Sequence, residues 1–296
     1  MSQVESHDVF IDSSALFEVF RKNLSSQLIN WIKKEKKRLI FSELIAAELM
    51  ANESEEKVLE DFKKLRQIWK DLGIKYSAWM MMPEEFFKTE IKNIIKSTPL
   101  ESVKITSKFK SLLSNPELLK IQYRNSDEGI KKSATLWKEK TYQSVDLNAQ
   151  ARFLESIKNG NSNLSTKDIS LIIKNYDGPK VECHFLDLLL EQLKCNSITS
   201  AQIIQSPARF RFLYTWSCLA ELTALGNLLP NSDGSPNAQM LRVDKGNWYD
   251  NTIAASATFC EIFLTNDENL IQKCNYLQSK NLIHFTAKRI SDILKI

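Results

Sequence analysis

The chain has 296 residues, 43% of them hydrophobic and 26% charged, which is typical of a globular protein with a sizeable core. Seven glycines, seven prolines and 9% aromatic residues argue against collagen-like, turn-dense all-β and disordered chains. The net charge of +4 is too small by itself to identify a nucleic-acid binder. With only three histidines, any catalytic chemistry in this chain has to rely on carboxylates.

The cysteines and the first residues predict the cellular setting. Five cysteines are an odd number and show no C-x-x-C spacing, so neither a disulfide framework nor a structural zinc site is expected. Residues 1–20 lack the basic start and long apolar run of a signal peptide. No stretch reaches about 18 uncharged apolar residues, the length needed to span a bilayer. We therefore expect a soluble cytoplasmic protein without a membrane segment.

The N-terminal part of the sequence alternates short apolar runs with helical patterns. Residues 9–11 predict a buried strand that stops at Asp12, and the serines at 13 and 14 can cap the helix that follows. Further elements are predicted at 27–37 (helix), 39–41 (strand), 43–50 (helix) and 55–72 (amphipathic helix, stopped by Gly73).

The rest of the chain divides into a helical middle and a second α/β segment. From about 83 to 230 the pattern is helical, most clearly at 84–96, 166–174, 183–193 and 209–227, and a polar loop follows at 230–236. Asp250 then opens a helix through 259, followed by a strand at 262–264, a helix at 268–277, a strand at 283–285 and a helix at 287–294. This order predicts an α/β fold whose central parallel sheet pairs strands from both ends. Residues 1–80 and 237–296 would form its core, and 81–236 a mostly α-helical insertion.

Four carboxylates stand where βα units place functional groups. Asp12 ends the first strand, Glu48 lies in the helix after the second, Asp250 starts a helix and Asp267 follows the strand at 262–264. The carboxyl ends of parallel strands share one edge of the sheet, so these side chains are expected to converge. Like charges that close together need a counter-charge, and Mg²⁺ or Mn²⁺ would supply it through oxygen ligands. The chemistry that follows is metal-assisted attack of water on a phosphodiester.

The same residues carry a resemblance to a known family. The segments 10–16 (FIDSSAL), 42–49 (SELIAAEL), 250–255 (DNTIAA) and 264–267 (LTND) resemble, in order, the four motifs of PIN-domain nucleases. The match covers roughly the first 80 and the last 60 residues. The interval from Glu48 to Asp250 departs from the pattern, because compact members of the family, such as the toxins of toxin–antitoxin modules, are far shorter there.

The resemblance implies a PIN-like three-layer α/β/α fold and a metal-dependent endoribonuclease, with DNA a less favoured substrate. Asp12 and Asp250 would bind the metal directly, and Glu48 and Asp267 would complete the site. Ser14 and Thr265 would orient waters or a carboxylate. The expected partners are RNA and an inhibitory, antitoxin-like protein.

Each of these acids also has a purely structural interpretation. Asp12, Asp250 and Asp267 would serve equally well as helix N-caps, and Glu48 as a solvated helix residue. Glu43 and Asp244 are competing acids close to Glu48 and Asp250 in the sequence. Two other functions therefore stay open: a catalytically inactive PIN-like scaffold whose helical region binds a partner, and an all-helical interaction protein.

Two basic features are candidates for binding the polyanion. Lys131 and Lys132 belong to a stretch from 104 to 140 in which basic residues outnumber acidic ones. Arg209 and Arg211 alternate with aromatic residues, as in single-strand binding proteins. The alternative interpretations are a solvated helical face for the first feature and a core segment for the second.

Overall fold

The computed structural model describes residues 7–42, 45, 48–49, 54–80, 86, 90, 115–118, 153, 155–156, 165–180, 184–192, 195–226 and 245–295. Four of the residues named above, Glu43, Lys131, Lys132 and Asp244, lie outside these ranges, and so does the loop predicted at 230–236.

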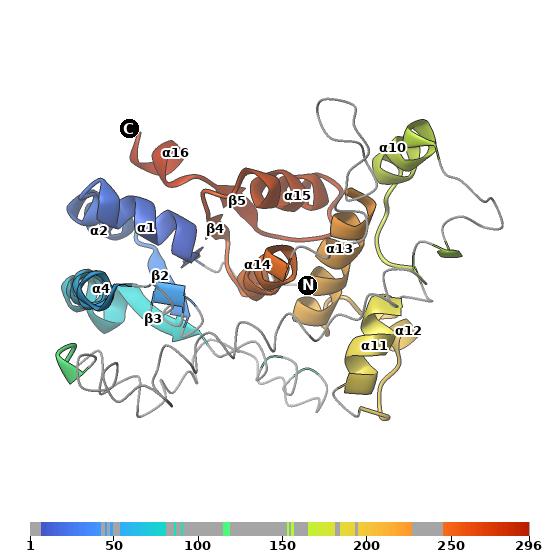
Figure 1. Cartoon of the computed structure of the whole chain (residues 1–296), viewed down its shortest axis with the longest axis horizontal. Coiled ribbons are helices and arrows are strands. Elements are labelled where there is room, and N and C mark those ends of the chain that lie inside the picture. Colours follow the sequence, from blue (N-terminus) through green and yellow to red (C-terminus); the bar gives the residue numbers. More distant parts are fainter. Residues whose placement is uncertain are drawn as a thin grey trace.

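A five-stranded parallel sheet forms the centre of the described structure (Figure 1). Its strands are β1 (Asp8–Ile11), β2 (Arg38–Ser42), β3 (Ser77–Met80), β4 (Ile262–Leu264) and β5 (Thr286–Lys288), in the order β3-β2-β1-β4-β5. β1 pairs with β2 on one side and with β4 on the other. The predicted α/β fold, with one sheet built from both ends of the chain, is confirmed.

The central strands β1 and β4 are apolar apart from Asp8, because both faces of the sheet are covered. Val9, Phe10 and Ile11 of β1 are fully buried. The Phe10 ring stacks on the Phe263 ring of β4, with 5.7 Å between the ring centroids. The paired strands β1 and β4 therefore lie at the centre of the hydrophobic core.

Two strands differ from the prediction. β3 was not predicted as a strand. Its Trp79 is buried against the Phe41 ring. The last strand is β5, three residues later than the predicted 283–285. Ile283 and Phe285 are buried, as the apolar pattern suggested, but pairing with β4 begins only at Thr286.

The helices around the sheet fall into two groups. α1 (Ser13–Arg21), α2 (Ser25–Lys34), α4 (Glu55–Tyr76) and α16 (Ile290–Leu294) are linked by contacts on one side. α13 (Arg211–Gly226), α14 (Lys245–Ser256) and α15 (Glu268–Ser279) pack together on the other, and α14 runs into a short 3₁₀ turn (Ala257–Phe259). Figure 1 shows the first group to the left of the strands and the second to the right. Right-handed crossovers in opposite directions from β1 require this division.

α4 ends its regular helix where the sequence predicted. Ser54 caps its start, accepting a hydrogen bond from the Lys57 amide at 3.4 Å. Gly73 has a φ of +64°, a left-handed conformation that glycine adopts without steric cost, and the helical path breaks there. The chain then turns directly into β3, which places α4 along the same side of the sheet as α1 and α2.

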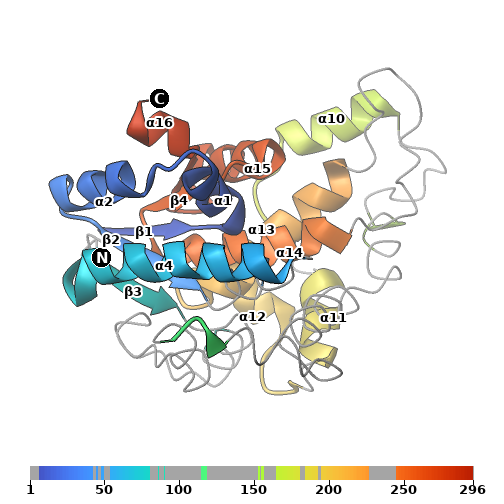
Figure 2. The same ribbon diagram turned by 60° about the vertical axis from the view of Figure 1, so that its left-hand side comes forward.

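The described part of the middle block is helical. α10 (Thr166–Lys174), α11 (His184–Gln192) and α12 (Ser200–Gln205) each contact α13, as Figure 2 shows, and no strand occurs among the described residues between 81 and 244. The aromatic residues at the start of α13 are buried, so the core interpretation of that segment is confirmed. No helix in the described ranges is both long enough and apolar enough to cross a bilayer.

Candidate active site

The strand order contains one topological switch point, between β1 and β4. From β1 the chain proceeds to β2 and β3 in one direction, and it returns to β4 and β5 in the other. In open α/β sheets, ligands bind in the crevice outside the carboxyl ends of the strands at such a point. Asp12 directly follows β1 and Thr265 directly follows β4, so two of the predicted site residues lie at this position.

Ser14 joins the two loops at the switch point. Its hydroxyl donates to the carboxylate of Asp12, 2.9 and 3.1 Å from the two oxygens. It also lies 3.3 Å from the hydroxyl of Thr265 and accepts a hydrogen bond from the Asn266 amide at 2.8 Å. The loop after β1 and the loop after β4 are therefore held together at the carboxylate of Asp12.

Asp12 and Asp267 both cap helices. One Asp12 oxygen accepts from the Ala15 amide at 2.8 Å, and one Asp267 oxygen accepts from the Leu270 amide at 2.8 Å. Both acids thus have the capping role that the purely structural interpretation predicts for them. A cap occupies only one carboxylate oxygen, so the second oxygen of each group can still serve a ligand.

Asp250 is not the first residue of its helix, which corrects the prediction. α14 begins at Lys245, so Asp250 stands in its second turn. The register is fixed by the packing of α14 on α13. The buried Asn251 side chain donates to Thr223 at 3.0 Å, and Trp216 donates to Thr252 at 3.3 Å. These long-range contacts override the preference of aspartate for a capping position.

Burial dominates the protonation behaviour of Asp12, which is 5% exposed. It raises the pKa of Asp12 to about 7 because the charged form loses hydration. Hydrogen bonds from Ala15, Thr265 and Ser14 oppose this rise, and the negative charge of Glu48 adds to it. Asp12 is therefore a carboxylate that titrates near neutral pH.

The pKa of Asp250 responds to the other three predicted acids. Burial raises it to about 7, and the negative charges of Asp267, Glu48 and Asp12 raise it further. Lys273 opposes the rise. The structure thus brings Asp250 within electrostatic range of the other three predicted carboxylates, although they come from separate segments of the chain.

Glu48 comes from the segment after β2. Residue 48 is helical and half-buried, its Oε2 atom is buried, and the neighbouring Leu49 packs in the core. Its charge acts on both Asp12 and Asp250. Glu48 therefore faces the other acids and is not a solvated helix residue.

Lys273 is a site residue that the sequence analysis missed. Its ammonium group donates to Thr223 at 3.0 Å and to Asn251 at 3.2 Å. Burial lowers the pKa of Lys273, and the charges of Asp250 and Asp267 act against that change. The signal in the sequence is its place on α15, where residues 270, 274 and 277 are buried and a lysine shares their face.

The donor chemistry of the site fits a hard divalent cation. The four acids offer only oxygen atoms, and their mutual repulsion favours a positive charge between them. Within the described residues, however, no three histidine, cysteine, aspartate or glutamate side chains lie close enough to form a ready-made metal site. In this arrangement Lys273 supplies part of the counter-charge.

The structure describes two of the four predicted nucleic-acid contacts. Arg209 and Arg211 are exposed at the start of α13, and the Arg209 guanidinium lies 4.9 Å from the centroid of the Phe210 ring. Lys131 and Lys132 fall outside the described ranges. A role for these residues in binding RNA stays a prediction.

Comparison of the chain with protein family models, with curated proteins and with solved structures gives no match in any of the three. The functional argument therefore depends on the fold and on the chemistry of the site.

Proposed function

We propose that this protein is a metal-dependent nuclease with a PIN-like three-layer core that acts as an endoribonuclease on RNA phosphodiesters. The observation that carries the proposal is that the Ser14 hydroxyl joins the loops after β1 and β4 at the Asp12 carboxylate. The pKa of Asp250, which burial and the charges of Asp267, Glu48 and Asp12 raise, supports it. Asp12 and Asp267 follow the two strands at the switch point of the parallel sheet, where such folds bind ligands, and the charges of Glu48 and Asp250 act near them. A set of mutually repelling carboxylates with oxygen donors alone is what a Mg²⁺ or Mn²⁺ site requires.

Each residue has a distinct role in this proposal. Asp12 and Asp250 would hold the ion directly, and Glu48 and Asp267 would complete the site through oxygens or bound waters. The bound ion would activate water and stabilise the leaving oxygen of the phosphodiester. Ser14 and Thr265 hold the Asp12 carboxylate in place. Lys273 balances negative charge beside Asp250 and Asp267.

One observation favours a second candidate function. The described acids do not form a ready-made metal site, and Lys273 already neutralises part of their charge. A catalytically inactive PIN-like scaffold would have these properties, with its helical region binding a protein or nucleic-acid partner. The two functions differ in whether a divalent ion binds and whether a phosphodiester is cleaved.

The test is cleavage of single-stranded RNA, structured RNA and DNA in Mg²⁺, Mn²⁺ or EDTA by the wild type and by Asp250→Asn. Asp250 caps no helix, so this change removes a charge without removing a cap. Loss of one direct metal ligand is expected to slow cleavage by about a hundredfold or more. Asp71→Asn is the control, because Asp71 is an exposed acid on α4.

Activity that survives EDTA or the Asp250→Asn change would overturn the proposed mechanism. If no nucleic acid is cleaved and no divalent ion raises the melting temperature, the scaffold is the correct function.

A further inference from the structure

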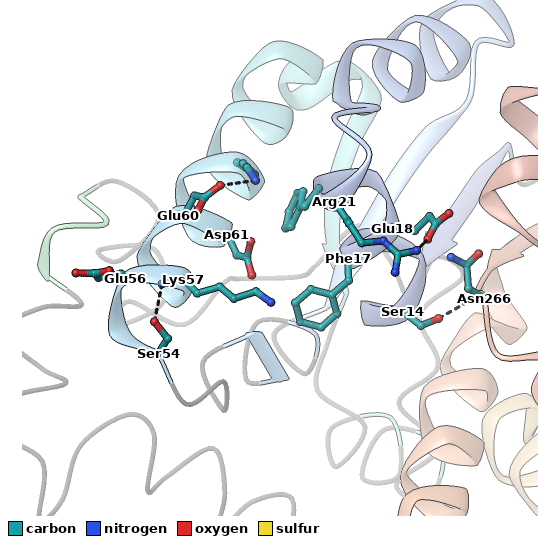
Figure 3. Close-up of a pocket in the computed structure, with 12 residues that line it drawn as sticks. Ser14, Phe17, Glu18, Arg21, Ser54, Glu56, Lys57, Glu60, Asp61 and Asn266 are labelled. Atoms are coloured by element: carbon teal, nitrogen blue, oxygen red, sulfur yellow. Dashed lines mark hydrogen bonds and ion pairs between the residues drawn. The ribbon is translucent and has the colours of Figure 1, made fainter. Parts of the chain in front are cut away.

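A groove opens between α1 and α4 and reaches the candidate active site (Figure 3). Its volume is about 830 Å³, within the range of roughly 300–1,000 Å³ typical of small-molecule sites. Ser14 and Asn266 line one part of it, and Ser14 is the residue that donates to the Asp12 carboxylate. A nucleotide next to the cleaved phosphodiester would therefore enter this groove.

Asp61 of α4 is the unusual residue in the lining. It is 3% exposed, and its buried Oδ2 atom has no hydrogen-bond partner among the described residues. Burial raises the pKa of Asp61, and the positive charges of Lys64 and Lys57 oppose the rise. A buried carboxylate oxygen without a donor is costly and rare, so a ligand that brings a donor is expected to bind there.

Two other acids that line the groove already have partners. Glu18 forms ion pairs with Arg21 and Lys22, and Glu60 pairs with Lys64 at 2.6 Å. Asp61 is thus distinguished from these acidic neighbours by its missing donor as well as by its burial.

Phe17 and Lys57 lie beside Asp61 in the groove. Phe17 is half-buried on α1, and Figure 3 shows the Lys57 side chain extending from α4 toward its ring. The ammonium group of Lys57 makes no ion pair within the described structure. An aromatic face, an acceptor for base edges and a free cation are the groups that proteins use to bind an unstacked base and its phosphate.

We propose that the groove binds one nucleobase of a single-stranded RNA beside the cleaved phosphodiester, and that it prefers guanine; this rests on the proposed nuclease function. The Watson–Crick edge of guanine carries two adjacent donors, N1–H and the N2 amino group, which match the two oxygens of the Asp61 carboxylate. Adenine, cytosine and uracil each present only one donor position on that edge, with an acceptor beside it that the carboxylate repels, so none of them offers two adjacent donors. Phe17 stacks on the base, and Lys57 contacts a phosphate.

The experiment is equilibrium binding of fluorescent RNA hexanucleotides to the full-length protein, with EDTA present so that no metal-dependent cleavage occurs. One position carries guanosine, inosine, adenosine, cytidine or uridine in an otherwise constant sequence. Inosine lacks only the 2-amino group of guanosine. The wild type is expected to bind the guanosine oligomer about tenfold more tightly than the inosine oligomer, because one hydrogen bond to a charged group is lost.

Asp61→Asn is expected to abolish this difference, because the amide offers one acceptor where guanine needs two. The control Asp71→Asn, on the same helix, is expected to retain it. Equal affinity of the wild type for guanosine and inosine would overturn the proposal, as would discrimination that persists in Asp61→Asn. The inosine comparison uses the unaltered protein, so it stands even if the variant folds poorly.

The proposed base site and the proposed nuclease function can each be refuted without refuting the other. RNA cleavage without a guanine preference would refute the base site and leave the nuclease intact. Guanine-dependent binding without any cleavage would refute the nuclease and leave the base site. If the groove instead receives an arginine of a protein partner, guanosine and inosine will bind alike, and the proposal is wrong.

Discussion

The hydroxyl groups of Ser14 and Thr265 lie 3.3 Å apart although 251 positions of sequence separate the two residues. One follows β1 and the other follows β4, the two strands that meet at the centre of the sheet. The same Ser14 hydroxyl bonds to Asp12 and to the Asn266 amide. The Ser14 side chain therefore both connects two loops of the fold and positions Asp12, a candidate metal ligand.

Ser14→Ala is expected to lower the free energy of unfolding by about 1 kcal/mol, since the Asn266 amide and the Asp12 carboxylate lose a partner. Urea unfolding measures this change. Ser13→Ala, the neighbouring serine on α1, is the control and should change stability by less than half as much. Equal effects of the two changes would show that Ser14 does not connect the loops energetically.

Asp12→Asn should stabilise the metal-free protein at high pH. The folded state raises the pKa of Asp12 to about 7, so the wild type has its full stability below the unfolded value near 4 and loses it as the pH rises through 7. In EDTA at pH 8 the variant is expected to be more stable by on the order of 2 kcal/mol, and the advantage should shrink at pH 5.

Melting at both pH values, with Asp71→Asn as the control, measures the effect of Asp12→Asn. Addition of Mg²⁺ should stabilise the wild type and reduce the difference in stability between it and Asp12→Asn. A wild type that is the more stable protein at pH 8 without metal would contradict the burial argument.

Lys273→Met tests whether the lysine and a bound metal ion compete to neutralise the acids. Without metal, the variant is expected to be less stable by about 1–2 kcal/mol, because Asp250 and Asp267 lose a neighbouring cation. With Mn²⁺, its melting temperature should rise more than that of the wild type, because the ion no longer competes with an ammonium group. Lys70→Met, at an exposed position of α4, is the control. A smaller metal response in Lys273→Met would place the lysine outside the ion site.

Phe17→Leu should weaken RNA binding without changing the choice of base. Leucine keeps an apolar side chain but loses the flat ring, and stacking on an aromatic residue contributes about 1–3 kcal/mol per base. Affinity for the guanosine and inosine hexanucleotides is expected to fall by about tenfold for both. Phe17→Tyr retains a ring and should restore binding. A change in the guanosine-to-inosine ratio would mean that the ring selects the base.

Replacing Lys131 and Lys132 by glutamate tests the basic stretch predicted from the sequence. If both lysines contact phosphates, RNA affinity should fall, and the slope of log affinity against log salt should become shallower by about 1.4. The adjacent lysines Lys33 and Lys34, exposed at the end of α2, provide a matched control pair. An unchanged slope would show that the stretch is a solvated helical face.

The parts of the site that could be predicted are those determined by local sequence. An apolar run followed by Asp12 and two serines predicts a strand, a cap and a helix, and the segment around Asp267 repeats this pattern. The alternation of such units at both ends of the chain was sufficient to predict a parallel sheet that joins them.

The parts that could not be predicted depend on distant contacts. The register of α14 is determined by the hydrogen bond between Asn251 and Thr223, which no local pattern reveals. Lys273 enters the site because α15 packs against α13 and α14, so a residue that looks like an ordinary helix lysine becomes half-buried beside the acids. β5 begins at Thr286 because pairing with β4, and not apolar character alone, defines a strand.

The central place of β1 has a consequence for how the protein is made. β1 is synthesised before β4, which covers one of its edges and follows more than two hundred residues later. A ribosome adding about 5–20 residues per second leaves that apolar edge open for roughly ten seconds or more, during which it is exposed to aggregation and to chaperones. Asp250 and Asp267 are also absent during that interval, so the four acids cannot come together until the segment that carries these two has been synthesised.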